Sequence, residues 1–241
     1  MASLLIHINF YIFLAVFIIA LTRNRNFNTV LVGITYMAPL VPLGLSPETA
    51  ERFLLVSFCN LIFGIIEVVV FVLTVKPGDT PFDKGHLKQL FGHTLPIVAA
   101  LVGLSFMGRA TAIPVSTLEL TLIILLFTFG SVMRVVAIYQ IGAVAFKFDI
   151  VFRQEQKLKT DQLHGLMRHP SYTAMMIVVV SYAVISHSLV WGAVGIVSAW
   201  AGFQYRIYHE ETALAEQFGE EYQAFRSSTG MWFPRVNQRK K

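Results

Sequence analysis

The chain has 241 residues, of which 55% are hydrophobic and 14% are charged. Soluble globular domains carry about 25% charged residues, so the composition excludes a soluble domain and indicates a polytopic membrane protein. The net charge of +5 does not indicate nucleic-acid binding, because the basic residues lie mostly in loops and near the C-terminus, as in the cytosolic segments of membrane proteins. The single cysteine, Cys59, excludes an internal disulfide and is typical of a small buried packing residue.

Seven apolar runs follow one another along the chain. A transmembrane helix needs roughly 20 apolar residues, and the third and fifth runs are the clearest spans. We interpret the first run as a transmembrane helix and not as a cleaved signal peptide, because it lacks a basic leader and a small-residue cleavage site. Prolines and glycines would bend the second run, the fourth run is short, and the last two runs predict a tight helical hairpin. The runs cover residues 4–22, 28–45, 53–75, 90–107, 117–145, 172–187 and 189–207.

The sequence therefore predicts a single all-α membrane domain over residues 1–241, with about seven transmembrane helices or, as the alternative, six. Residues 1–116 would form the N-terminal transmembrane helices, and residues 117–241 a core that ends in the helical hairpin. With seven spans, the basic segments fall on the same side as the C-terminus, and the positive-inside tendency makes that side the cytosol. These segments contain Arg23, Arg25, Lys76, Lys84, Lys88, Lys147, Arg153, Lys157, Lys159, Arg168, Arg239, Lys240 and Lys241.

Ionisable residues also occur inside the apolar runs. Glu67 lies in the third run and Arg134 in the fifth, while Glu119 lies near a membrane edge. An unpaired charge within a bilayer is costly, and such residues often mark functional sites. Two interpretations stay open. In the first, Arg134 pairs with Glu67 or reaches toward the cytosolic edge; in the second, Arg134 helps to line a pocket for a charged ligand.

A polar cluster lies where a loop enters the sixth apolar run. It comprises residues 168–172, which read Arg-His-Pro-Ser-Tyr. Pro170 disfavours helix in the residue before it and suits the first turn of the helix that follows. The backbone amides of residues 171–173 are then predicted to be helix-start donors that are available to a ligand. His169 and Tyr172 add side-chain donors at this edge, so the cluster is a candidate binding site.

A second polar cluster lies where the seventh run returns to water, and it contains Arg206, Glu210 and Glu211. An apolar hairpin would bring it to the same membrane edge as residues 168–172. Arg206 and Glu210 are four residues apart and share one face of a helix. An arginine can clamp a carboxylate with two hydrogen bonds, and a glutamate can hold an ammonium. The pair therefore suits a ligand with both charge signs, and the alternative is an ordinary ion pair at the membrane surface.

The chain lacks the short motifs of several common enzyme classes. It has no G-x-G-x-x-G segment after a strand, no P-loop, no H-E-x-x-H segment and no cysteine cluster. His164 and His169 lack a third ligand at a suitable spacing. We therefore expect no metal site.

The residue pattern resembles the C-terminal half of isoprenylcysteine carboxyl methyltransferases, which are integral membrane enzymes of the endoplasmic reticulum. The resemblance covers about residues 135–236, and the combined pattern is more specific than its Arg-His-Pro-x-Tyr element, which related families share. The N-terminal runs match only as apolar helices. The matching residues are Leu158, Thr160, Gly165, Arg168, His169, Pro170, Ser171, Tyr172, Arg206, Glu210, Glu211, Leu214, Phe218, Gly219, Tyr222 and Pro234.

In that family S-adenosylmethionine binds in a cytosol-facing pocket, and its methyl group esterifies the C-terminal carboxylate of a prenylated cysteine in CaaX-processed proteins. The resemblance thus implies that residues 117–241 form a catalytic methyltransferase core embedded in the lipid bilayer. It implies farnesylated or geranylgeranylated protein C-termini as partners. Arg206 matches the catalytic arginine that faces the substrate carboxylate, whereas Gln156 and His164 depart from the histidine and tyrosine that are usual there. The implied cofactor contacts are Gln156, Lys157, Leu158, Lys159, His164, His169, Pro170, Ser171, Tyr172 and Glu210.

Three other functions share parts of this pattern. A phospholipid N-methyltransferase has the same cofactor motif but methylates an amine, which needs no arginine clamp, so Arg206 favours a carboxylate acceptor. An NADPH-dependent sterol reductase has a related C-terminal half but a different polar set around the motif tyrosine. A non-catalytic membrane scaffold would not need both Arg206 and Glu210.

Overall fold

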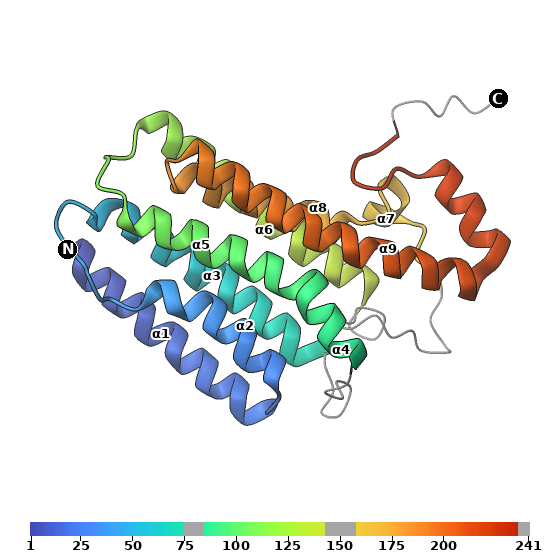
Figure 1. Ribbon diagram of the computed structural model, residues 1–241, viewed down its shortest axis with the longest axis horizontal. Coiled ribbons are helices and arrows are strands. Elements are labelled where there is room, and N and C mark those ends of the chain that lie inside the picture. The colour runs from blue at the N-terminus through green and yellow to red at the C-terminus, as the bar shows by residue number, and fades with distance from the viewer. Residues whose placement is uncertain (75–83, 143–157, 236–241) are drawn as a thin grey trace.

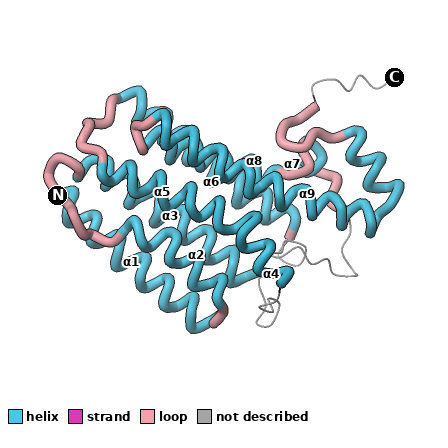
Figure 2. Tube along the Cα trace, in the orientation of Figure 1, coloured by secondary structure: helices cyan, strands magenta, loops and turns pink. Residues whose placement is uncertain are grey.

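The structure is a computed structural model that describes residues 1–74, 84–142 and 158–235. Across these residues the chain is helical, with connecting loops and one isolated parallel bridge between Met167 and Gly230, and it contains no β-strand (Figure 2). The predicted all-α class is confirmed. The helices are α1 (Ala2–Arg23), α2 (Phe27–Met37), α3 (Ala50–Thr74), α4 (Lys84–Gln89), α5 (Leu95–Ala110), α6 (Thr117–Ile141), α7 (Gln162–Leu166), α8 (Pro170–Ile185) and α9 (Leu189–Ser228).

Within the described residues, four helices are long and apolar enough to cross a membrane. They are α1, α3, α6 and the segment Leu87–Ala110, which runs from the end of α4 through a π-helical turn into α5. The segments Phe27–Leu40 and α8 are shorter apolar helices. The second run is bent as expected, because α2 passes at Met37 into a 3-10 turn that contains Pro39. The number of seven spans stays a prediction.

The helices form an elongated bundle, in which the N-terminus lies at one end and α7 at the other (Figure 1). Helix α8 packs against α6 and α9, α5 packs along α9, and α3 contacts α1, α2 and α5. Edge-to-face aromatic contacts run through the core, from Tyr36 to Phe63, Phe127 and Tyr182, with ring centroids 5.9 to 6.4 Å apart. Large apolar side chains stay exposed along α1, α6 and the first part of α9, as expected for helices that face lipid.

The last two apolar runs form the predicted hairpin. Helix α8 ends at Ile185, and the Ser188 hydroxyl caps α9 by accepting a hydrogen bond from the Trp191 amide. Helix α9 does not stop where its apolar run ends but continues to Ser228, with a kink at Gly219 (φ 52°, ψ −122°). The positive φ angle suits glycine. The part of α9 beyond residue 207 carries the charged residues Glu216, Glu220 and Glu221.

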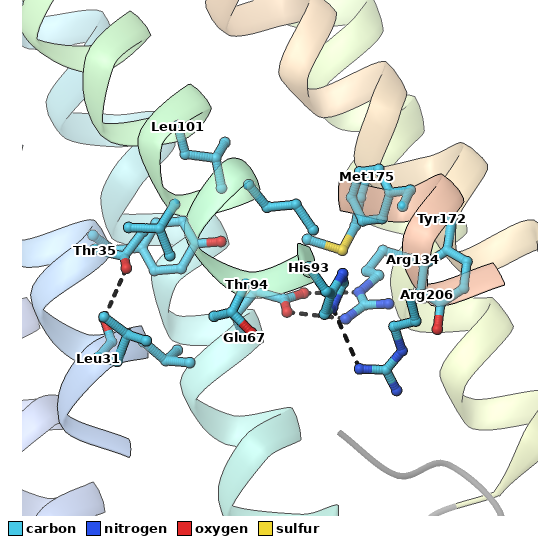
Figure 3. A pocket seen from close by; sticks show the side chains of 15 residues that line it. Leu31, Thr35, Glu67, His93, Thr94, Leu101, Arg134, Tyr172, Met175 and Arg206 are labelled. Carbon is cyan, nitrogen blue, oxygen red and sulfur yellow. Dashed lines mark hydrogen bonds and ion pairs between the residues drawn. The ribbon is translucent and has the colours of Figure 1, made fainter. Parts of the chain in front are cut away.

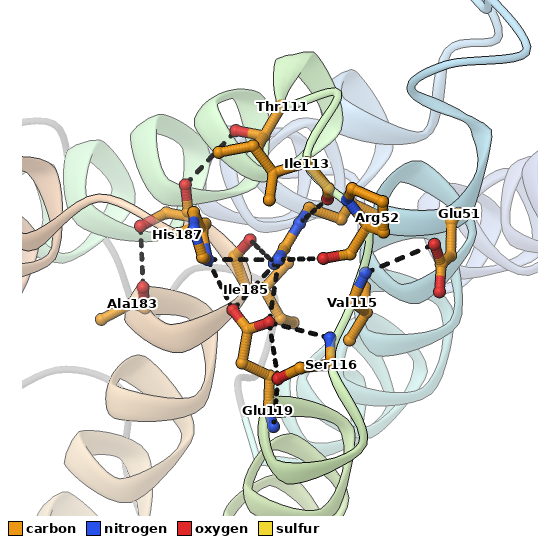
Figure 4. A network of polar contacts seen from close by, with 12 residues as sticks. Glu51, Arg52, Thr111, Ile113, Val115, Ser116, Glu119, Ala183, Ile185 and His187 are labelled. Carbon is orange, nitrogen blue, oxygen red and sulfur yellow. Dashed lines mark hydrogen bonds and ion pairs between the residues drawn. The ribbon is translucent and has the colours of Figure 1, made fainter.

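A polar network around Arg52 and Glu119, drawn in Figure 4, lies at the end of the bundle opposite α7 (Figure 1). Arg52, which is 1% exposed, donates hydrogen bonds to the Glu119 carboxylate at 3.0 and 3.1 Å and to the backbone oxygens of Ile113 and Ile185 at 2.6 and 3.1 Å. Glu119 also forms a capping box with Ser116 at the start of α6. Arg52 thus ties the start of α3 to the start of α6 and to the hairpin turn.

Replacing Arg52 with methionine is expected to destabilise the bundle by about 3 kcal/mol, because Glu119 and the backbone oxygens of Ile113, Pro114 and Ile185 lose a donor. This corresponds to a drop of roughly 10 °C in the melting temperature of the detergent-solubilised protein, measured by scanning fluorimetry. Arg23→Met is the control, since Arg23 is exposed at the end of α1. Equal melting temperatures for the two variants would contradict this role of Arg52.

Candidate active site

The two polar clusters of the sequence lie together, at the end of the bundle that carries α7. Arg168 and His169, just before α8, contact Glu211 of α9 at 2.8 and 3.2 Å, and the Tyr172 hydroxyl donates a hydrogen bond to Glu210. The prediction that the hairpin joins the clusters is confirmed. The site therefore belongs to the start of α8 and to α9 at the point where its apolar part ends.

Arg206 and Glu210 form the expected ion pair within α9. The Arg206 Nε atom lies 2.7 Å from the Glu210 Oε1 atom, and the Tyr172 hydroxyl donates to the same oxygen. Arg206 is only 5% exposed, so this is not an ion pair of the solvent-exposed surface. The Tyr172 ring stacks between the rings of His169 and Phe203, with centroids 5.6 and 5.4 Å away, and Arg206 lies 5.8 Å from its centre.

Glu211 anchors the start of α8 to α9. Its carboxylate accepts hydrogen bonds from Arg168 and His169, and Arg226 lies 3.5 Å away. Burial raises the pKa of Glu211, but the hydrogen bonds from His169 and Arg168 outweigh burial and lower the pKa to about 2. Glu211 is therefore ionised near neutral pH and holds residues 168 and 169 in place.

The backbone amides at the start of α8 differ from the prediction. The amides of Tyr172 and Thr173 both donate to the His169 carbonyl oxygen at 3.1 Å. His169 is the N-cap residue of α8, with φ −124° and ψ 57°, and its carbonyl oxygen accepts both of these helix-start donors. The prediction that these two amides are available to a ligand is wrong.

The loop before α8 brings a further predicted contact to this end. His164 of α7 is buried, and its Nδ1 atom has no hydrogen-bond partner among the described residues. Lys159 pairs with Asp161 at 2.8 Å, and Leu158 begins the described segment. The predicted contacts Gln156 and Lys157 lie outside the described residues.

Burial, together with the nearby charges of Lys159 and His169, lowers the pKa of His164 to about 4. Between about pH 6.5 and pH 4 the unfolded chain then binds a proton at this residue that the folded chain does not bind. Stability should therefore fall as the pH decreases through this window. We expect His164→Gln to reduce the fall in melting temperature by about 5 °C.

The pH series is measured by scanning fluorimetry without added cofactor, and His7→Gln on α1 is the control. A fall in melting temperature between pH 6.5 and pH 4 that is the same in wild type and His164→Gln would contradict the assignment.

The charges inside the apolar runs form a buried pair. Arg134 Nε lies 2.8 Å from Glu67 Oε1, and Arg134 Nη2 lies 3.0 Å from Glu67 Oε2, which is a bidentate arrangement. Arg134 also donates to the Ser171 hydroxyl. The predicted Glu67–Arg134 pair is confirmed, and it connects α3 and α6 to the start of α8.

A cavity of about 60 Å³ lies between α2, α3, α5, α6, α8 and α9, and the side chains around it are shown in Figure 3. Apolar side chains such as Leu31, Ile97 and Leu101 form one part of its wall. Arg206, Arg134 and Glu67 form the other part. The ion pair of the first interpretation is confirmed, and Arg134 also lines this cavity. That the cavity takes a charged ligand stays a prediction.

Comparisons with known proteins decide the family. A model of the isoprenylcysteine carboxyl methyltransferase family matches residues 122–216. The protein-S-isoprenylcysteine O-methyltransferase B of Arabidopsis thaliana is 33% identical over 193 residues, which cover 79% of this chain and 94% of the plant protein. The chain belongs to the isoprenylcysteine carboxyl methyltransferase family. The A form of the plant enzyme is 32% identical over 198 residues, with 79% of this chain and 97% of that protein covered.

A solved structure of a eukaryotic intramembrane Ras methyltransferase, ICMT, has the same fold. Its TM-score is 0.53 at 17% sequence identity, and the match covers 95% of this chain and 85% of that chain. The segment matched by the isoprenylcysteine carboxyl methyltransferase model contains α7, α8 and most of α6, together with Arg206, Glu210 and Glu211. His93, which also lines the cavity, lies outside that segment. A lone histidine in an apolar run gave no signal in the sequence.

Proposed function

We propose that this protein transfers the methyl group of S-adenosylmethionine to the C-terminal carboxylate of a prenylated cysteine. The substrates are C-termini of CaaX-processed proteins that carry a farnesyl or geranylgeranyl group. The reaction takes place in the endoplasmic reticulum membrane, with the site and the C-terminus on the cytosolic side. The observation that carries the proposal is the buried Arg206, which lines a cavity whose remaining wall is largely apolar.

The residues at the α7 end fit the cofactor. The buried His164 Nδ1 atom, which has no partner in the described part of the chain, is suited to a hydrogen bond with a bound ligand. The Glu210 carboxylate suits the ammonium group, and bound S-adenosylmethionine would supply an electrophilic methyl group. The residues proposed to hold it are Leu158, Lys159, His164, His169, Pro170, Ser171, Tyr172 and Glu210, with Gln156 and Lys157 from the segment outside the described residues.

Methyl transfer to a carboxylate requires the protein mainly to bind and orient the two substrates. A carboxylate is ionised at neutral pH, so the acceptor needs no general base. Arg206 would orient the carboxylate through its guanidinium group, and the surrounding apolar side chains would exclude water from it. A cation at this position has no purpose for an amine acceptor, which favours the carboxyl methyltransferase over a phospholipid N-methyltransferase.

The prenyl chain would occupy the apolar part of the cavity. Leu31 and Val32 line it from α2, and Ile97, Val98 and Leu101 line it from α5. The cavity of about 60 Å³ is smaller than typical ligand sites, which enclose about 300 Å³ or more. Binding of the prenyl chain would therefore move these side chains apart. In this proposal the prenyl chain enters between the helices from the lipid side.

Membranes that contain this chain provide the direct test, with radiolabelled S-adenosylmethionine and N-acetyl-S-farnesylcysteine as substrates. A base-labile methyl ester is the expected product. Label in phospholipid headgroups without ester would contradict the proposal and favour a lipid N-methyltransferase. Transfer to neither acceptor would favour a reductase or a scaffold, and heat protection of the purified protein by NADPH would then distinguish these two.

A further inference from the structure

A π-helical turn lies between α4 and α5 and comprises Leu90–Thr94. Such turns are rare, and they frequently occur at functional sites because the extra residue changes the direction of the side chains around it. His93 lies in this turn and is 9% exposed. Its ring lines the cavity beside Arg206 (Figure 3).

Two glycines bring this turn close to α9. A Cβ atom on Gly202 would lie 2.8 Å from the His93 carbonyl oxygen, and a Cβ atom on Gly92 would lie 2.6 Å from the Tyr205 ring. Both distances are too short for a side chain, so each glycine permits the close approach. The approach places the His93 Nδ1 atom 3.1 Å from the Gly202 carbonyl oxygen.

The partners of the His93 ring select one tautomer. A carbonyl oxygen only accepts hydrogen bonds, so Nδ1 must carry the proton. The Nε2 atom lies 3.4 Å from Arg206 Nη1, and a guanidinium group only donates. A neutral ring with its proton on Nδ1 satisfies both contacts, whereas a doubly protonated ring would place a second cation against Arg206.

We propose that His93 is a positioning residue for Arg206. Glu210 holds Nε of the guanidinium group at 2.7 Å, and His93 holds Nη1 at 3.4 Å, so contacts on two nitrogens fix the plane of the group within the cavity. This inference rests on the proposed function, in which Arg206 orients the substrate carboxylate. His93 acts only through Arg206, because a small error in orientation lowers the rate of methyl transfer.

Two substitutions separate this role from a structural one. Asparagine can place its amide nitrogen near the position of Nδ1 and keep the bond to Gly202, but it cannot reach Arg206. Glutamine can place its amide oxygen near the position of Nε2 and keep the contact with Arg206. We expect His93→Asn to lower kcat/KM for N-acetyl-S-farnesylcysteine about 10-fold, and His93→Gln to lower it less than about 3-fold.

The dissociation constant for S-adenosylmethionine should stay within about 2-fold of wild type in both variants, since the His93 ring contacts Gly202 and Arg206, which are not among the proposed cofactor residues. The opposite order, with His93→Asn active and His93→Gln impaired, would show that His93 only anchors α5 to α9 and would overturn the proposal. Failure of the wild-type protein to form any ester is a different result, because it contradicts the proposed function before any variant is compared.

The Arg206→Ala background gives a second, independent readout. If His93 acts through Arg206, then adding His93→Asn to Arg206→Ala should change kcat/KM by less than about 2-fold. If His93→Asn lowers kcat/KM as much in the Arg206→Ala background as it does in wild type, then His93 affects the enzyme by another route. This result would overturn the proposal.

Discussion

Arg206→Ala is expected to lower kcat/KM for a prenylated cysteine by about 100-fold or more, while the dissociation constant for S-adenosylmethionine changes by less than about 3-fold. The first effect follows from burial, because Arg206 is 5% exposed and lines a cavity with a largely apolar wall. A water molecule in its place would lack the positive charge that pairs with the substrate carboxylate. Radiolabel transfer gives the rate, and isothermal titration with the detergent-solubilised protein gives the cofactor affinity.

The small effect on cofactor binding has its own structural reason. Glu210 loses its partner Arg206 in this variant, but the Tyr172 hydroxyl still donates to the Glu210 carboxylate. Glu211 also still holds Arg168 and His169. The contacts that shape the α7 end of the site therefore remain, and the loss is confined to the acceptor.

Arg206→Lys and Arg23→Ala complete the experiment. Lysine keeps the charge but not the planar fork, so Arg206→Lys should recover only part of the activity. Arg23 is an exposed arginine at the end of α1, and its removal should leave kcat/KM unchanged. Near wild-type turnover in Arg206→Ala would remove Arg206 from the mechanism.

The sequence predicts contacts best where two residues are close along one helix or share a hairpin. The Arg206–Glu210 pair follows from their spacing of four residues, and the meeting of Tyr172 with Glu210 follows from the hairpin turn at residues 186–188. The Glu67–Arg134 pair was predictable for a different reason. Two opposite charges in apolar runs have few other partners inside a bilayer.

Contacts between distant elements need the rotation of each helix about its axis, which the sequence does not specify. Arg52 reaches Glu119 because three segments meet at one end of the bundle, and His93 reaches Arg206 because a π-helical turn and a glycine allow close approach. The capping of α8 by the His169 carbonyl oxygen depends on one pair of backbone angles. The position of Pro170 in the sequence predicts where the helix starts but not these angles, so the amides of Tyr172 and Thr173 were predicted to be available.

The Glu67–Arg134 pair makes the second large prediction, and it separates stability from activity. Glu67→Leu or Arg134→Leu alone should destabilise the protein by about 3–5 kcal/mol, because each leaves one buried charge without its partner. The double variant removes both charges and should recover most of this loss, since apolar side chains suit the apolar surroundings. Melting temperatures of the three variants measure the coupling.

The affinity for S-adenosylmethionine should not recover together with the stability of the double variant. In the double variant the Ser171 hydroxyl loses the donor Arg134, which ties the start of α8 to α6. We expect the affinity for S-adenosylmethionine to stay about 10-fold below that of wild type, although the melting temperature is restored. Recovery of both properties would show that the pair serves only the fold. Recovery of stability alone would mean that the bilayer-embedded pair is retained because it sets the position of the cofactor-binding residues.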